Sequence, residues 1–305
     1  MYIVTGATGW VGKNFLHCLQ KIIDRKKFNT EVFCFANKTR KIYSTAYREK
    51  IEIPIIPLSE INNIFEGHSN LKIIHTAFLT REKIKDFGKE EYIRKNQSIT
   101  NLIENLLIKN YGSRIVIISS GAAKNYDFNL SECKLATAEP YSFLKREEEI
   151  KLSKISDSLI LRIFALTGKF IRDPEIFALG NFLISAKQNK PIKILSNAPV
   201  SRSYGYAGDI ADLSIKWLTS GLVGYPNPIA AVSETIDLLT LAKKITKIYS
   251  LPNLKHNINF DLDGNDYLAD TDEFKLLLNK FNIKSTSMED QIKITFNYLK
   301  DHDLY

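Results

Sequence analysis

The sequence predicts an α/β fold, in which helices cover a doubly wound parallel sheet that is joined to a smaller α/β region. Short apolar runs rich in β-branched residues alternate with longer segments of helical periodicity over residues 1–164. The first of these runs passes through a glycine-rich turn into a helix. Beyond residue 166 the alternation weakens, so we expect the smaller region to begin there.

The first strand is expected at residues 1–4, which form a short apolar run. The turn behind it, Thr5–Gly12, has the sequence TGATGWVG and spaces three glycines as G-x-x-G-x-x-G. Glycine lets a phosphate approach the backbone, and the N-terminus of the following helix attracts anions. Tight strand-to-helix turns also need glycine for steric reasons, but this context favours a dinucleotide cofactor. The residues assigned to it are Gly6, Thr8, Gly9, Trp10 and Val11.

The second strand, expected at residues 31–36, ends without the acidic residue that commonly binds a ribose 2′-hydroxyl. It continues into Asn37, Lys38, Thr39 and Arg40. Because Lys38 and Arg40 suit a 2′-phosphate, NADP(H) is favoured as the cofactor. NAD(H) stays possible because Asn37 alone can serve its ribose, and a merely polar loop explains the pattern equally well.

The remaining elements follow in order along the chain. Further strands are expected at 53–56, 71–77, 114–118, 158–164, 191–195 and 229–232. Helices are expected at 10–23, 91–109, 140–149, from 180 onward, 210–218 and 238–248. His75, at a strand end, is expected to be a hydrogen-bonded core residue. The tail from Asn253 onward is polar and resists assignment.

Candidate catalytic residues lie at the end of one strand and on the helix that follows. Ser119 and Ser120 end the strand at 114–118, while Tyr141 and Lys145 stand four apart and share one helix face. A free phenol has a pKa of about 10, and a neighbouring ammonium lowers it toward neutrality. A serine hydroxyl can hold a substrate oxygen against the phenol while a nicotinamide exchanges hydride. Tyr-x-x-x-Lys alone often occurs by chance, but its combination with the glycine turn favours catalysis.

These motifs resemble those of the extended short-chain dehydrogenases/reductases, in the NAD-dependent epimerase/dehydratase family, which act on nucleotide sugars and have a Rossmann-type fold. The resemblance spans roughly the first 250 residues. It rests on the glycine turn, His75-Thr76-Ala77, Asn96, Ser119-Ser120-Gly121-Ala122, Tyr141, Lys145, Arg162, Asn181-Phe182 and Arg202-x-Tyr204.

The resemblance implies roles for individual residues. Tyr141 would be the acid/base, Lys145 would tune its pKa and contact the nicotinamide ribose, and Ser120, in preference to Ser119, would orient the substrate. Further implied cofactor contacts are Ala77, Phe78, Leu79, Asn96 and Ser119. Further implied substrate contacts are Gly121, Ala122, Asn181, Phe182 and Arg202. Arg202 would grip the diphosphate, although a surface ion pair with Asp209 or Asp212 is the alternative.

Departures from the family pattern narrow the expected reaction. Gly121-Ala122-Ala123 follows the serines where the family usually has Val-Tyr-Gly, and Ala165 stands where an asparagine is frequent. No Asp-Glu pair follows Ser120, which argues against dehydration. Reduction of a 4-keto(-6-deoxy) sugar in deoxysugar and cell-surface polysaccharide biosynthesis is favoured. The alternatives are C4 epimerisation with tightly bound NAD and, less favoured, a non-catalytic NADP(H)-binding sensor.

Chain length and composition suggest the domain organisation. The 305 residues exceed one small domain. We expect a dinucleotide-binding domain at 1–166, completed by about 203–235, and a substrate-binding region at 167–202 and 236–305.

Charge and cysteine usage limit the expected partners. The net charge of +8 is spread without a dense Lys/Arg block, so no nucleic-acid partner is expected. Cys18, Cys34 and Cys133 form no C-x-x-C pair, so neither a disulfide framework nor a metal site is expected. The absence of a leader and of a long apolar run predicts a cytoplasmic protein without membrane contact. The expected assembly is a homodimer.

Overall fold

The computed structural model describes residues 1–44, 51–127 and 139–302. The chain divides into two compact units. The first unit comprises Met1–Arg162 and Ala211–Ile229, and the second comprises Ile163–Ile210 and Ala230–Tyr305. Cys133 lies outside the described residues.

The first unit is built on an eight-stranded sheet with the order β10-β7-β6-β5-β1-β2-β4-β3. β1 pairs in parallel with both β2 and β5, so the sheet extends in both directions from the first strand. β5 pairs in parallel with β6, and β2 with β4, whereas the edge strand β3 is antiparallel to β4. The strands are β1 (Tyr2–Thr5), β2 (Val32–Ala36), β3 (Arg40–Ser44), β4 (Ile51–Pro57), β5 (Lys72–His75), β6 (Arg114–Ser120), β7 (Asp157–Ile163) and β10 (Tyr225–Ala230). The doubly wound α/β fold predicted from the sequence is confirmed.

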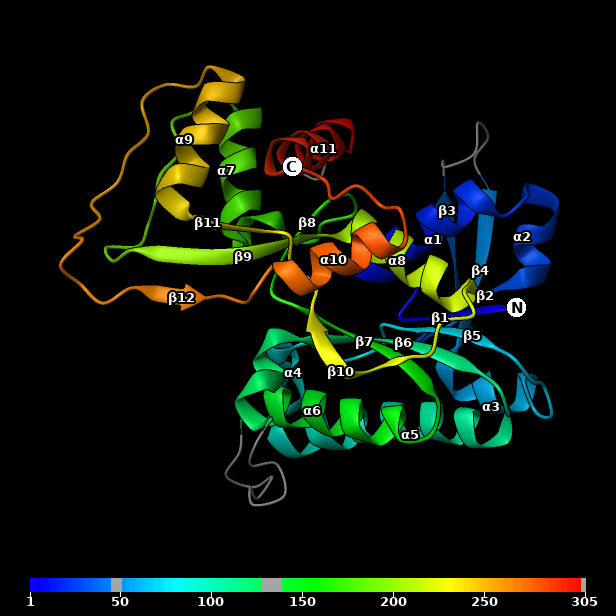
Figure 1. The fold of residues 1–305 in the computed structure, drawn as a ribbon. Coiled ribbons are helices and arrows are strands. Elements are labelled where there is room, and N and C mark those ends of the chain that lie inside the picture. The colour runs from blue at the N-terminus through cyan, green and yellow to red at the C-terminus, as the bar shows by residue number, and fades with distance from the viewer. Residues whose placement is uncertain (45–50, 128–138, 303–305) are drawn as a thin grey trace. The chain divides into compact units, whose positions relative to one another are not determined.

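Helices cover both faces of this sheet (Figure 1). α1 and α2 lie on one face, and α3, α5 and α6 lie on the other. The helices of this unit are α1 (Trp10–Ile22), α2 (Arg25–Glu31), α3 (Ile61–Ile64), α4 (Ile84–Phe87), α5 (Lys89–Lys109), α6 (Pro140–Ser153) and the greater part, from Ala211 onward, of α8 (Ala207–Thr219). A fully buried cluster that includes Phe35, Phe65, Ile103 and Leu152 packs between the sheet and α3, α5 and α6. This apolar layer holds the strand ends, and so the side chains that follow them, in fixed register.

The second unit contains a smaller sheet in which β9 (Val200–Tyr206) is central. β11 (Glu234–Asp237) pairs with it in antiparallel fashion, while β12 (Asn265–Tyr267) and β8 (Ala165–Thr167) pair with it in parallel. Its helices are α7 (Ala178–Lys187), α9 (Leu238–Tyr249), α10 (Asp272–Lys280) and α11 (Met288–Asp301). In the part of the chain that the structure describes, no helix has the length and apolarity needed to cross a membrane.

Most predicted elements are present, but both units contain errors, and the edge strand β3 of the first unit was not predicted. The strand predicted at 191–195 is wrong, because Lys193 makes only an isolated bridge to Lys255. Every second side chain of this segment is indeed buried, as Ile192 and Ile194 show. An extended segment that is buried without a partner strand has the same pattern as a paired strand, so the pattern alone does not distinguish them. The strand predicted at 229–232 instead occupies 225–230, and β9 lies where no strand was predicted. Cys18 and Cys34 are buried core residues, as expected.

Candidate active site

The glycine turn after β1 is closely packed. Gly6 has φ +66°, and a Cβ there would lie 2.5 Å from the Thr76 hydroxyl oxygen and 2.7 Å from the Ala77 backbone nitrogen. A Cβ on Gly12 would lie only 2.3 Å from the carbonyl oxygen of Gly6. Gly9 is the N-cap of α1, and no side chain caps that helix. The turn is therefore a backbone-lined cradle at a helix N-terminus, where a phosphate group fits.

The residues after β2 lie at the surface. The turn that joins β2 to β3 consists of Asn37, Lys38 and Thr39, and these three residues and Arg40 are all exposed. Arg40 opens β3 and pairs with Ile55 of β4. The cationic side chains expected at a ribose are thus accessible to a ligand.

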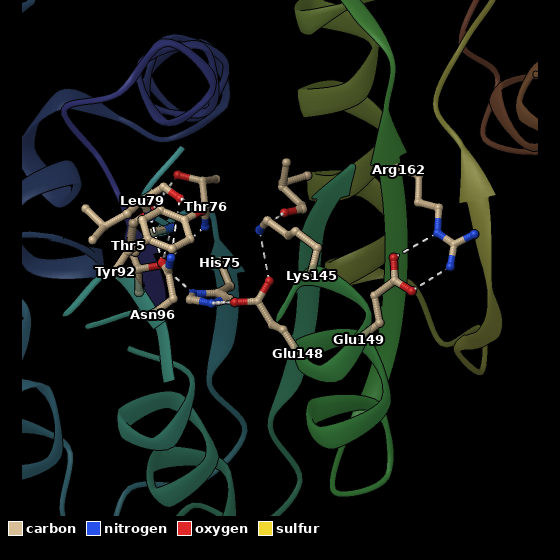
Figure 2. Close-up of polar contacts among 12 residues, drawn as sticks. Thr5, His75, Thr76, Leu79, Tyr92, Asn96, Lys145, Glu148, Glu149 and Arg162 are labelled. Atoms are coloured by element: carbon tan, nitrogen blue, oxygen red, sulfur yellow. Dashed lines mark hydrogen bonds and ion pairs between the residues drawn. The ribbon is translucent and has the colours of Figure 1, made fainter. Parts of the chain in front are cut away.

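Asn96 of α5 fixes the loop that follows β5. Its amide oxygen accepts the Leu79 N–H at 2.8 Å and its amide nitrogen donates to the Leu79 carbonyl, which also accepts the Tyr92 hydroxyl at 2.7 Å (Figure 2). Asn96 is fully buried. Its side chain therefore holds the loop Ala77–Leu79 in place and does not project from the protein surface.

The structure brings Ser120 and Tyr141 together. The Ser120 hydroxyl is hydrogen-bonded to the Tyr141 phenol and accepts the Ala122 N–H at 3.2 Å. Gly121 and Ala122 begin the short 3-10 helix Gly121–Tyr126 that Ser120 caps. Among the described residues, the buried hydroxyl of Ser119 has no hydrogen-bond partner, so it is available to a ligand.

Burial dominates the electrostatics of Tyr141. Burial raises the pKa of the Tyr141 phenol, while the hydrogen bond with Ser120 and the positive charge of Arg81 act to lower it. The Arg81 guanidinium lies 5.4 Å from the centroid of the Tyr141 ring, and Phe78 packs edge-on against the same ring. The net direction keeps the phenol protonated near neutral pH.

Lys145 belongs to a buried polar chain that sequence reasoning found only in part. Its ammonium donates to the Ile118 carbonyl at 3.0 Å and to Glu148 at 2.9 Å, and it lies 3.8 Å from the Phe78 ring centroid. The other Glu148 oxygen contacts His75 at 3.0 Å (Figure 2). The expectation that His75 is a hydrogen-bonded core residue is confirmed, whereas Glu148 was missed.

A signal for Glu148 was present in the sequence. It stands three residues after Lys145, a spacing at which two side chains lie on the same helix face. Glu149, the next residue, is equally buried but binds Arg162 at 2.8 Å and 2.7 Å on another side of α6 (Figure 2). Because three glutamates follow one another at 147–149, the sequence does not show which of them contacts Lys145.

The remaining predicted contacts lie in the second unit. Asn181 is half-buried and Phe182 is buried, both on α7. Arg202, on β9, donates to the Ser201 carbonyl and to the backbone and side-chain oxygens of Asn265. Asp209, the alternative partner considered for Arg202, accepts from the backbone N–H and the hydroxyl of Thr286.

A doubly wound parallel sheet with a glycine cradle at its first strand end, and a paired serine and tyrosine beside a lysine, defines a dinucleotide-binding protein of the dehydrogenase type. The model of the NAD-dependent epimerase/dehydratase family matches residues 2–227. The chain therefore belongs to that family, as its motifs predicted. A search of curated proteins finds no significant match.

Several solved structures share the fold over nearly their whole length. A UDP-glucose 4-epimerase from Thermotoga maritima, solved with UDP-glucose, is 17% identical with a TM-score of 0.71, covering 98% of each chain. A UDP-glucuronic acid 4-epimerase from Bacillus cereus, solved with UDP-glucuronic acid and NAD, is 17% identical with a TM-score of 0.67, covering 100% of this chain and 99% of the other. An NAD-dependent NDP-hexosamine 5,6-dehydratase of tunicamycin biosynthesis is 14% identical with a TM-score of 0.68, covering 99% and 98%. At these identities the likeness establishes the fold alone.

Proposed function

We propose that the protein is an NAD(P)-dependent oxidoreductase that acts on a nucleotide-linked sugar and reduces a 4-keto(-6-deoxy) group. The observation that carries the proposal is the hydrogen bond that pairs the Tyr141 phenol with Ser120, and burial raises the pKa of that phenol. A protonated phenol is the acid that a ketone reduction needs. The first oxidative step of an epimerase needs the phenolate instead.

The residues of the first unit fit a dinucleotide. Gly6 and Gly12 line a cradle that a Cβ would fill, and the buried hydroxyl of Ser119 lacks a partner within the described ranges. The glycine turn, with Thr8, Trp10 and Val11, would hold the pyrophosphate, and the loop Ala77–Leu79 would line the site. Because the Asn96 amide is hydrogen-bonded to Leu79, Asn96 would not contact the cofactor itself but would hold the loop that does.

The proposed reaction needs one proton donor and one holder of the reacting oxygen. A reduced nicotinamide held in this site would provide the hydride for the keto carbon. Ser120 hydrogen-bonds the carbonyl oxygen, and Tyr141 transfers its phenolic proton to that oxygen, which yields the alcohol and a phenolate that solvent reprotonates. Lys145 stabilises the transient phenolate and would contact the ribose.

Substitution of Tyr141 tests the catalytic role. Tyr141→Phe should lower turnover by at least about 10²–10⁴-fold and leave cofactor affinity nearly unchanged, because it removes only the acid. Tyr111→Phe is the matched control, since Tyr111 is 92% exposed. If the Tyr141→Phe variant kept most of the wild-type activity, Tyr141 would not be the acid of the reaction.

C4 epimerisation with tightly bound NAD is the second candidate, and it is favoured by the family description and by the 4-epimerases among the structural neighbours. Supplying NADPH or NADH with 4-keto-6-deoxy nucleotide sugars, and following nicotinamide absorbance, distinguishes the two. Cofactor oxidation supports the reductase. Copurified NAD together with interconversion of UDP-hexoses supports the epimerase. A non-catalytic sensor is less favoured, because it has no need of Ser120, Tyr141 and Lys145 together.

The cofactor preference stays a prediction. The family description names NAD, and the Bacillus cereus neighbour was solved with it, so these comparisons do not support NADP. The case for NADP(H) rests on the exposed cations of Lys38 and Arg40. Fluorescence titration with NADPH and NADH would decide, and loss of an NADPH preference in Lys38→Ala/Arg40→Ala would assign it to these residues.

Substrate contacts in the second unit are part of the same proposal. Arg202 has the planar guanidinium that suits a diphosphate, and Asn181 and Phe182 would line the nucleotide. The side chain of Phe182, on α7, is buried. We also propose that the first unit holds the cofactor and that the protein works in the cytoplasm as a homodimer.

A further inference from the structure

We propose that Glu148 and His75 are positioning residues of the active site. His75 fixes the Glu148 carboxylate, and Glu148 in turn holds the Lys145 ammonium and offsets its charge beside Tyr141. The proposal rests on the proposed function only for the roles of Tyr141 and Lys145. The contacts themselves belong to one buried chain that runs from β1 through β5 to α6.

Hydrogen-bond accounting assigns the protonation state of His75. The Thr5 hydroxyl oxygen accepts the N–H groups of Thr76 and Ala77 at 3.2 Å and 3.3 Å, which uses both of its lone pairs. Its own proton therefore goes to the His75 Nδ1, 2.7 Å away. Nδ1 is then an acceptor, so Nε2 carries the ring proton and donates it to Glu148. His75 is neutral in this arrangement.

Glu148 then carries the compensating charge. Its carboxylate is fully buried, and its oxygens are divided between Lys145 and His75. Burial alone would raise the pKa of Glu148, but the charge of Lys145 and the contacts with His75 hold it below its usual value. Lys145 donates two of its three ammonium protons to Glu148 and the Ile118 carbonyl, and the ammonium also lies over the Phe78 ring.

The consequence reaches Tyr141. The charged groups that act on its phenol are Glu148 on the same helix and Arg81 and Glu82 after β5, and the phenol of Tyr92 on α5 is coupled to it. Lys145 and Tyr141 both pack against the Phe78 ring. The negative charge of Glu148 disfavours the phenolate, and so it helps to keep Tyr141 in the acid form. Neutralising Glu148 should lower the pKa of Tyr141, and it should also loosen Lys145.

Titration of Tyr141 in the cofactor-free protein tests the proposal without a substrate. Tyrosine labelled at Cζ reports each phenol by NMR, and Tyr141→Phe identifies the resonance. Glu148→Gln should lower the Tyr141 midpoint by about one pH unit. Glu148→Asp keeps the charge and should restore the midpoint. Glu149→Gln is the matched control, because Glu149 is as buried but binds Arg162, and it should leave the midpoint unchanged.

An unchanged midpoint in Glu148→Gln, or an equal fall in both Gln variants, would overturn the proposal. Should Glu148→Gln fail to fold, nitrogen NMR of His75 in the wild-type protein decides. A neutral Nε2–H tautomer at about neutral pH supports the chain, and an Nδ1–H tautomer or a protonated ring overturns it. None of these results depends on which sugar is reduced, so the proposed reaction can fail while this inference stands.

Discussion

Gly12→Ala offers a direct test of the glycine cradle. Gly12 is the third residue of α1, and the added Cβ would lie 2.3 Å from the Gly6 carbonyl oxygen and 2.9 Å from the Ala7 Cα. These atoms are backbone, so the turn itself would have to retreat by about 1 Å to reach ordinary contact. Overpacking of this kind costs about 1–3 kcal/mol, and the better helix propensity of alanine returns at most about 1 kcal/mol. We expect a net loss of about 1–2 kcal/mol in the free energy of unfolding.

Urea unfolding and cofactor titration measure the two effects of this substitution. Displacement of the turn should also weaken dinucleotide binding by about tenfold or more, equivalent to about 1.4 kcal/mol. Gly221→Ala is the control, because Gly221 is exposed and a Cβ there meets nothing within 4 Å. It should change neither quantity. If Gly12→Ala kept both wild-type stability and wild-type affinity, the cradle would not be the close-packed phosphate site inferred from it.

Two further predictions follow from buried polar contacts. Asn96→Ala removes the amide that binds Leu79, so the free energy of unfolding in urea should fall by about 1–3 kcal/mol. Cofactor binding should also weaken. An unaltered cofactor affinity would show that Asn96 does not support cofactor binding through the loop. Burial by itself would raise the pKa of the Asp127 carboxyl, but the hydrogen bonds and the charge of Arg162 hold this pKa below its usual value. The stability from Asp127 is therefore present above about pH 4 and lost as the pH falls through its depressed folded-state pKa. Asp127→Asn should thus show a smaller loss of stability on acidification than the wild type, and parallel acid-unfolding curves would contradict this.

Local periodicity was enough to predict the part of the protein that holds the glycine turn. The apolar runs of β1, β5 and β6 and the helix of Tyr141 and Lys145 follow from residue spacing along one segment. Ser120 ends β6 and Tyr141 stands on the next helix, α6, and the family resemblance indicated that these two side chains act together. Each of these features depends on residues close in sequence or on the general rules of sheet topology.

Only the tertiary structure decided the contacts between distant residues. His75 and Glu148 lie 73 positions apart, and nothing local distinguishes Glu148 from Glu149 in a run of glutamates. The segment at 191–195 alternates buried and exposed residues as a strand does, but it has no partner strand within residues 1–44, 51–127 and 139–302. β9, with its small and polar residues, pairs with three other strands. Strand pairing and buried ion pairs are set by which side chains the packed core brings together, and a one-dimensional pattern does not contain that information.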